Sequence, residues 1–120
     1  PALRKVYDFR VNATFPGDIS LYGPDQVEAW VSHLLSAFPD LHLSIDHVAE
    51  TPYLGEAMDV ALRWTATGTH TGPGRYGAPS GAQVYLLGVT QFRIMKGRVR
   101  EQVTIWDDLA LRRQIAASRP

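Results

Sequence analysis

Hydrophobic and polar side chains alternate through residues 59–70, which predicts a long strand that runs into a glycine-rich loop at residues 71–77. One predicted face is apolar and ends in an imidazole; it carries Val60, Leu62, Trp64, Ala66, Gly68 and His70. The other face carries Arg63 and threonines, which suits partial contact with solvent. The apolar face is typical of a pocket wall with one polar group at its mouth. The alternative is that Trp64 belongs to the core and His70 lies at the edge of a loop.

The spacing of apolar residues predicts the remaining elements. A helix begins after Gly23, because Pro24 and Asp25 are typical of a first helical turn, and Pro39 ends it. Its apolar stripe is Val27, Trp30, Val31, Leu34, Leu35 and Phe38. Strands are predicted at residues 11–15, 41–46, 82–95 and 98–106, and a last helix begins at residue 107.

Long consecutive strands joined by short turns imply an antiparallel, curved sheet, and a helix covering its open side would leave a conical pocket. We therefore predict a single α+β domain over residues 1–120, whose first helix is truncated to its last residues. A kink or bulge is expected at Gly88. Such a bulge would switch the faces of the strand, so either Thr90 or Gln91 could point into the pocket.

Composition and charge narrow the classes of function. The net charge is zero and no basic run occurs, which argues against a nucleic-acid partner. No apolar run approaches the ~20 residues of a membrane span, so no membrane association is expected. The chain has no cysteine, which excludes disulfides and thiolate chemistry. A reducing, cytoplasmic location is the expectation that follows.

Two motif-like patterns are interpreted as structural. Gly72, Gly74 and Gly77 spell GxGxxG, but a dinucleotide fingerprint must open a helix, and here prolines and a strand-like segment follow. A flexible rim loop is the better interpretation. No two histidines lie at ligand spacing with a carboxylate between them, so no metal site is predicted.

Some side chains could serve either a ligand or the fold. Asn12 lies in the short strand and could bind a ligand or cap a turn. Trp30 and Phe38 suit the core, although a helix over a concave sheet could also present them to a ligand. Asp107 precedes a helix, where an aspartate is expected as the cap.

Several short motifs occur in the order typical of one family. They are FPDL at residues 38–41, RWTATGTHTG at 63–72, APSG at 78–81, GVTQFRIMKGRV at 88–99 and EQVTIWDDLALRRQI at 101–115. On these motifs, over roughly residues 30–115, the chain resembles the SnoaL-like polyketide cyclase, or ester cyclase, family of the NTF2-like superfamily. The resemblance implies an NTF2-like cone, with a curved antiparallel sheet and helices around a pocket, and chemistry without cofactor or metal.

The activity that the resemblance implies is intramolecular aldol ring closure of polyketide esters by acid–base catalysis. The implied catalytic pair is Asp107, the nearest acid in the matching segment, with His70. Many relatives carry an acid three residues earlier, where this chain has Thr104; if the family acid belongs there, Asp107 is only a helix cap. The cyclase hypothesis predicts Asp107 in the pocket within reach of His70.

The resemblance also implies an apolar small-molecule ligand and, by analogy, a homodimer formed through the open sheet face. The side chains expected to contact the ligand are Asn12, Trp30, Phe38, Trp64, Thr90, Gln91 and Thr104. Two other functions stay open: a binding module without chemistry, and an epoxide hydrolase-like enzyme in which Arg63 or Arg93 joins two carboxylates around one water. An acid that faces the pocket with a raised pKa would distinguish the catalytic hypotheses from binding alone.

Overall fold

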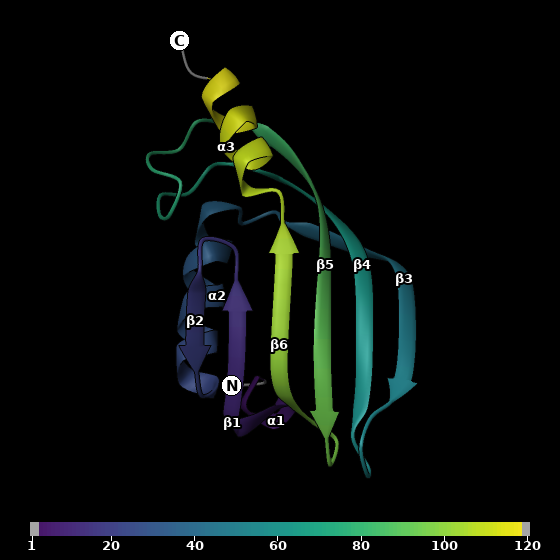
Figure 1. Ribbon diagram of the computed structural model, residues 1–120. Coiled ribbons are helices and arrows are strands. Elements are labelled where there is room, and N and C mark those ends of the chain that lie inside the picture. The colour runs from purple at the N-terminus through teal and green to yellow at the C-terminus, as the bar shows by residue number, and fades with distance from the viewer. Residues whose placement is uncertain (1–2, 119–120) are drawn as a thin grey trace.

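The computed structural model describes residues 3–118, which form a single curved sheet with its longest helix on one face (Figure 1). The elements in chain order are α1 (Leu3–Val6), β1 (Tyr7–Phe15), β2 (Ile19–Tyr22), α2 (Pro24–Ala37), β3 (His42–Pro52), β4 (Met58–Thr69), β5 (Gln83–Met95), β6 (Arg98–Trp106) and α3 (Asp108–Ala117). The predicted α+β cone is therefore confirmed. The strand β2 was not predicted, because four residues after a turn are too short to show alternation.

The sheet has the order β2-β1-β6-β5-β4-β3. The strands β3 to β6 form antiparallel neighbours, as hairpin connections require. In contrast to the antiparallel pattern expected, β1 lies parallel to β6, so the sheet is mixed. Hairpin turns predict only pairings between consecutive strands, and the β1–β6 pairing joins opposite ends of the chain. The strand β3 also runs further than predicted, to Pro52, with a bulge between Ile45 and His47 where the alternation breaks.

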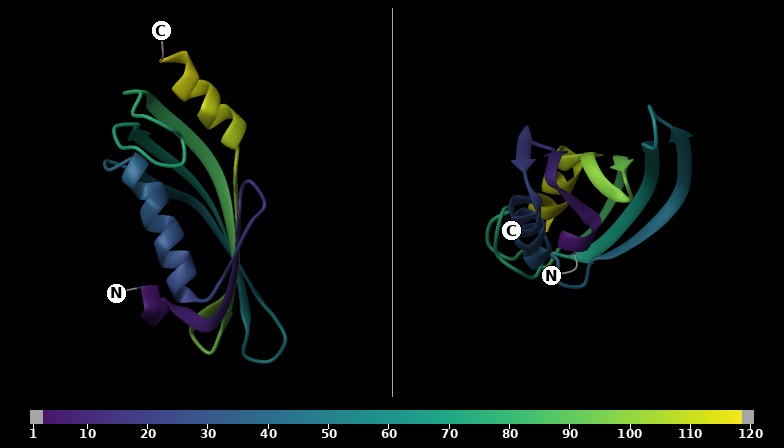
Figure 2. Two further views of the ribbon diagram at one scale, coloured as in Figure 1. Left: turned by 90° about the vertical axis from the view of Figure 1, so that its left-hand side faces the viewer. Right: turned by 90° about the horizontal axis from the view of Figure 1, so that it is seen from below.

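Helix α2 crosses the concave face of the sheet, while no helix of residues 3–118 lies on the opposite face (Figure 2). The stripe of α2 packs on the sheet as predicted, and Trp30 contacts Phe15 with ring centroids 4.1 Å apart. At the far end of the sheet, α3 buries Leu111 and Ile115 in a second cluster with Phe38. The two helices therefore leave the middle of the concave face between them.

The strand β5 runs without the bulge expected at Gly88, because its register with β4 is continuous. Gly88 lies opposite Trp64, and a Cβ atom at this position would come within 2.2 Å of Trp64 Cζ2. The glycine is therefore required by the close approach of the Trp64 indole, and not by a bend of β5. A continuous register also settles the direction of the neighbours: Thr90 points to the concave face and Gln91 points to the opposite one.

The loop of residues 70–82 packs against the body of the molecule. Two backbone hydrogen bonds of 2.8 Å hold the two ends of the loop together. They run from His70 N to Ala82 O and from Gly81 N to His70 O. The N–H of Gly72 donates to the carbonyl of Ala37 at the end of α2, and a Cβ atom on Gly72 would lie 1.8 Å from Ser36 O. The glycine therefore permits close contact between loop and helix, and no helix follows the GxGxxG pattern.

Large apolar side chains remain exposed on the face of the sheet opposite α2. We call this surface the open face; its apolar residues are Tyr85, Leu87 and Val89 of β5 and Val103 and Ile105 of β6. Their exposed fractions lie between 42% and 63%. A contiguous exposed apolar patch of this kind is a feature of interaction surfaces.

Candidate functional site

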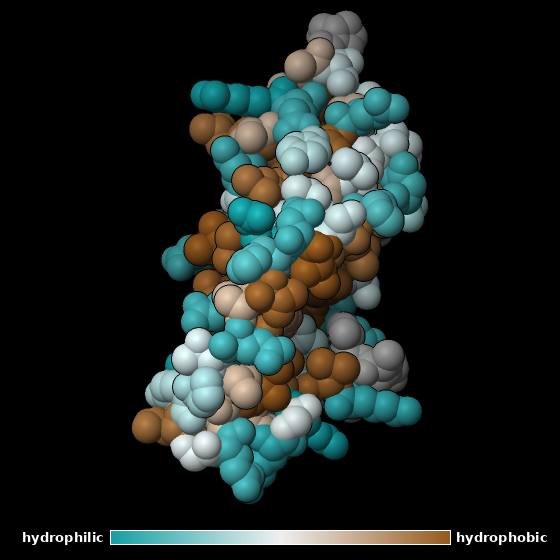
Figure 3. Space-filling model, turned by 90° about the vertical axis from the view of Figure 1, so that its right-hand side faces the viewer, coloured by the Kyte–Doolittle hydropathy of each residue, from teal (hydrophilic) through white to brown (hydrophobic). Residues whose placement is uncertain are grey.

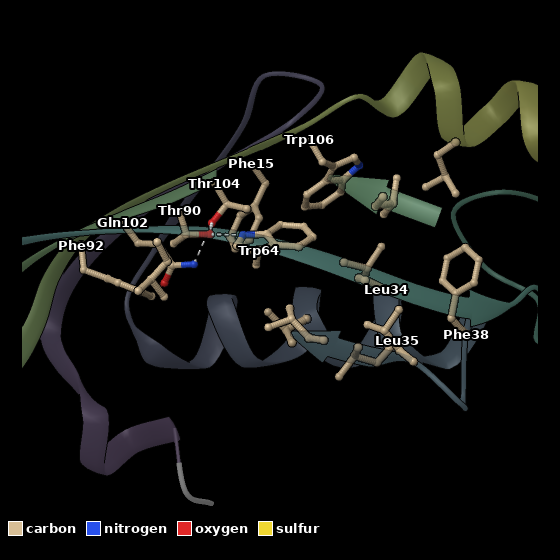
Figure 4. Close-up of a pocket in the computed structure, with 17 residues that line it drawn as sticks. Phe15, Leu34, Leu35, Phe38, Trp64, Thr90, Phe92, Gln102, Thr104 and Trp106 are labelled. Atoms are coloured by element: carbon tan, nitrogen blue, oxygen red, sulfur yellow. Dashed lines mark hydrogen bonds between the residues drawn. The ribbon is translucent and has the colours of Figure 1, made fainter. Parts of the chain in front are cut away.

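A cavity of about 320 Å³ lies between α2 and the concave face of the sheet (Figure 4). The side chains that form its apolar wall include Phe15, Leu34, Phe38, Leu62, Leu86 and Trp106. Leu35 and Leu43 also line it and are 42% and 48% exposed, so the cavity opens between α2 and β3. Figure 3 shows hydrophobic side chains gathered across the middle of the molecule on the β3 side, with hydrophilic ones above and below.

The aromatic part of the wall is held by contacts behind it. Trp106 lies edge-on to Trp64, with ring centroids 6.4 Å apart, and it also contacts Phe15 and Trp30. Trp30, one of the expected ligand contacts, does not line the cavity; it supports Phe15 and Trp106 from the helix. The aromatic side chains of the wall are therefore supported by ring contacts with one another, which suits an apolar, ring-containing ligand.

One chain of hydrogen bonds supplies the polar groups of the cavity, and we call it the polar floor. Trp64 Nε1 donates to Thr90 Oγ1 at 2.9 Å, and Thr90 Oγ1 lies 3.0 Å from Thr104 Oγ1. Gln102 Nε2 donates to Thr104 Oγ1 at 3.1 Å, and the Tyr7 hydroxyl donates to Gln102 Oε1 at 2.5 Å. All five side chains are more than nine-tenths buried, and burial raises the pKa of Tyr7.

The cavity collects part of the predicted contact set. Phe38, Trp64, Thr90 and Thr104 line it, from α2, β4, β5 and β6 respectively. The polar floor also contains Gln102, which sequence reasoning missed. The alternation of side chains along the strand could have identified it, since Gln102 and Thr104 share a strand face with Trp106.

Two predicted contact residues lie on the wrong side of the sheet. Asn12 is exposed and pairs across strands with Tyr22 and Glu101, and Gln91 is exposed beside Arg93. The structure therefore places Asn12 outside the cavity, and of the alternatives Thr90 and Gln91 it is Thr90 that faces inward. The reason is the alternation of side chains along a strand, which directs their buried neighbours Val11 and Thr90 inward instead.

His70 is fully buried, yet it does not line the cavity. Its Nδ1 lies 2.8 Å from Ser80 Oγ and accepts from the Ser80 N–H at 3.3 Å, and its ring packs on Phe38 at a centroid distance of 5.5 Å. These contacts join the two ends of the rim loop. In this structure the histidine therefore serves to hold the loop behind the cavity wall.

Asp107 is exposed and caps α3, where its Oδ1 accepts from Ala110 N at 2.9 Å. The expectation that it lies in the pocket within reach of His70 is wrong. The physical reason is local: the first N–H groups of a helix have no partner in the helix, and the preceding aspartate satisfies one of them.

The neighbouring Asp108 is the acid that links helix, loop and sheet. It accepts from the Tyr76 hydroxyl at 2.7 Å, from Arg112 Nε at 2.9 Å and from Trp106 Nε1 at 3.1 Å. Partial burial opposes ionisation, but the hydrogen bonds from Tyr76, Arg112 and Trp106 outweigh it and hold the pKa of Asp108 below its usual value. Burial of the phenol, and after it the hydrogen bond to the same carboxylate, raise the pKa of Tyr76. Asp108 does not line the cavity.

Arg93, one of the two arginines of the epoxide hydrolase hypothesis, lies on the face of the sheet opposite the cavity. Arg93 binds Asp59 through Nε at 2.9 Å and Glu101 through Nη1 at 3.0 Å, and it stacks on Tyr53. The hydrogen bonds of Arg93 lower the pKa of Asp59. These groups form surface ion pairs away from the cavity, and Arg63 is exposed as well. The arrangement of two carboxylates and an arginine around one water in the pocket is therefore not present among residues 3–118.

Within the described residues, no three His, Cys, Asp or Glu side chains lie together as metal ligands would. The helices of the same part of the chain include none long and apolar enough to cross a membrane.

Residues 2–115 match the sequence model of the SnoaL-like polyketide cyclase family. Curated protein sequences include no significant match. A protein from Jannaschia sp. CCS1, provisionally described as a SnoaL-like polyketide cyclase, is 28% identical with a TM-score of 0.82; the match covers 98% of this chain and 78% of that one.

Two further solved structures share the fold. AclR from Streptomyces galilaeus, provisionally described as a hydroxylase, is 26% identical with a TM-score of 0.75, covering 94% of this chain and 68% of its own. IdmH from Streptomyces antibioticus, provisionally described as a polyketide cyclase, is 21% identical with a TM-score of 0.76, covering 95% and 84%. The last similarity is one of fold alone.

Proposed function

Because the chain belongs to the SnoaL-like polyketide cyclase family, we propose that it binds an apolar, ring-containing small molecule in the cavity between α2 and the sheet. The observation that carries this proposal is the lining of the cavity. None of its described lining residues is Asp, Glu, His, Lys or Arg, and its polar groups are confined to the polar floor. A volume of about 320 Å³ is at the lower end of the range for small-molecule pockets.

Binding is favoured over acid–base ring closure by the positions of the two implied catalytic residues. Proton transfer requires a base within hydrogen-bond reach of the substrate. Asp107 faces solvent at the start of α3, and His70 is engaged by Ser80 behind Phe38. The fold alone does not select a reaction, since neighbours of this fold are described both as a hydroxylase and as cyclases.

The open face supports a second proposal, that two copies of the chain associate. The exposed fractions of Leu87 and Ile105 are 55% and 63%, and both lie on the side of the sheet opposite the cavity. Burial of this surface against a second copy would remove the apolar area from water without closing the cavity.

The binding proposal is tested with fluorene, a planar tricyclic hydrocarbon, and two matched variants of β4. Ala66 lines the cavity, whereas Ala61 lies on the opposite face of the same strand. We expect Ala66→Phe to bind fluorene roughly tenfold more weakly or worse, because the ring occupies space in which the ligand buries apolar area worth about 25 cal/mol per Å². Ala61→Phe should bind like the wild type. Equilibrium dialysis gives the affinities, and equal affinities in all three proteins would refute the cavity as the site.

The same titration separates capping from ligand contact at Asp107. We expect Asp107→Ala to bind fluorene as the wild type does and to lose about 1 kcal/mol of unfolding free energy, the typical value of a helix cap. Urea denaturation measures the second quantity. A loss of affinity without a loss of stability would restore Asp107 to the site.

A further inference from the structure

The polar floor contains more hydrogen-bond donors than it can satisfy by itself. Its five side chains carry six polar hydrogens: one each on Trp64, Tyr7, Thr90 and Thr104, and two on Gln102. The four hydrogen bonds among these side chains use four of the six. Two hydrogens remain in a buried site, where an unpaired donor costs free energy.

One of the two belongs to the threonine pair. Thr90 and Thr104 lie directly opposite each other in β5 and β6, and each Oγ1 already accepts from a group that can only donate there, the indole or the amide. One hydroxyl can donate to the other, but the second hydroxyl must then direct its hydrogen elsewhere. Figure 4 shows both hydroxyl groups and the Gln102 amide grouped on one side of the cavity.

The orientation of the Gln102 amide matters, because a flipped amide would accept from Thr104 and leave no threonine hydrogen free. The distances favour the unflipped orientation. The contact with the Tyr7 hydroxyl is 2.5 Å, which suits O–H···O and is short for N–H···O, whereas the contact with Thr104 is 3.1 Å, which suits N–H···O.

We infer that the polar floor recognises a hydrogen-bond acceptor oxygen, such as a ring carbonyl, on an otherwise apolar ligand, with the Thr90–Thr104 pair and the Gln102 amide as donors. This inference rests on the proposed binding function and specifies the ligand class for the same cavity. A carbonyl has lone pairs and no hydrogen, so it takes up the free donors without adding another. A ligand that offers only an N–H would leave both donors unpaired.

The test uses three planar tricycles of nearly the same shape, which differ at one ring position: fluorene with CH₂, 9-fluorenone with C=O and carbazole with N–H. In the wild type we expect 9-fluorenone to bind about three- to tenfold more tightly than carbazole, the range of one net hydrogen bond. The preference should shrink in the variant Thr90→Val/Thr104→Val, because methyl groups take the places of the two hydroxyls and only the Gln102 amide remains of the inferred donors.

The variant Thr90→Ser/Thr104→Ser keeps both hydroxyls and should retain the preference, which separates the donors from general effects on packing. Equilibrium dialysis measures the ratio of carbazole to 9-fluorenone dissociation constants in each protein. If fluorene binds but the wild type shows no preference for 9-fluorenone, the inference is overturned and the binding function stands. If the valine variant does not fold, the wild-type ratio and the serine variant still decide. If no tricycle binds the wild type, the binding proposal fails and the inference with it.

Discussion

Trp64 and Gly88 show how a single residue shapes the cavity. The indole crosses over Gly88 and delivers its Nε1 to Thr90, so the absence of a side chain at position 88 is what allows the polar floor to form. The same indole forms part of the apolar wall beside Trp106. One glycine therefore supports both the polar and the apolar parts of the site.

We expect Gly88→Ala to lower the unfolding free energy by about 1–3 kcal/mol, because its methyl group would overlap the Trp64 ring in a packed site. The cost should be smaller in a Trp64→Phe background, since the phenyl ring is shorter than the indole. A double-mutant cycle from urea denaturation measures the coupling between the two positions. Equal costs in the two backgrounds would show that Gly88 is needed for another reason.

At the level of elements, Asp108 attaches α3 to the rest of the fold. Its carboxylate accepts from Tyr76 in the rim loop, from Trp106 at the end of β6 and from Arg112 within the helix. One acid behind the cavity wall therefore joins the end of β6, the rim loop and α3. A change in its protonation reaches three elements at once.

The lowered pKa of Asp108 gives this attachment a pH dependence. A carboxyl group whose pKa is lower in the folded state stabilises the fold above its unfolded pKa, near 4, and this contribution is lost as the pH falls through the folded pKa. We expect Asp108→Asn to cost on the order of 1–2 kcal/mol at pH 6, below the full value of charged hydrogen bonds because asparagine keeps one acceptor. The difference from wild type should shrink below about pH 4.

Thermal unfolding between pH 3 and pH 7 measures this difference. The matched control is Glu50→Gln, which makes the same kind of change at an exposed acid in β3. A gap between Asp108→Asn and the wild type that stays constant over the whole range would mean that the charge of Asp108 does not contribute.

For the whole molecule, the question is what covers the open face. The helices lie on the concave side, so the apolar residues of β5 and β6 face solvent in a single chain (Figure 2). A surface of this kind on a chain of 13.3 kDa favours association with a second copy, because the same patch is present on both partners.

We expect the wild type to be a dimer at micromolar concentration and Leu87→Lys to be a monomer, because a lysine in the middle of the patch would bury an unpaired charge. The control is Val48→Lys, a position of similar exposure in β3 that lies outside the open face. Light scattering coupled to size-exclusion chromatography measures the mass of each protein. A monomeric wild type at about 100 μM would contradict the proposal. A dimer that survives Leu87→Lys would place the interface elsewhere.

The sequence alone determined the α+β class, the long strands, the stripe of α2 and the family, because these depend on periodicity and on local motifs. It also indicated candidates for the site: Trp64 by strand parity, Thr90 as an alternative to Gln91 by the same argument, and Thr104 by the resemblance to the family. Parity has one ambiguity, a possible bulge at Gly88, and only the register of β5 against β4 removed it.

Tertiary structure decided the rest, because the remaining features depend on contacts between distant segments. The pattern of β6 is misleading locally: Val103 and Ile105 are apolar yet exposed, whereas Gln102 and Thr104 are polar yet buried. The partners of the buried pair come from β1 and β5, far away in the chain. In the same way, the choice between base and cap at Asp107 depended on where its carboxylate points. The carboxylate accepts from the backbone of the helix that follows it and does not reach the cavity.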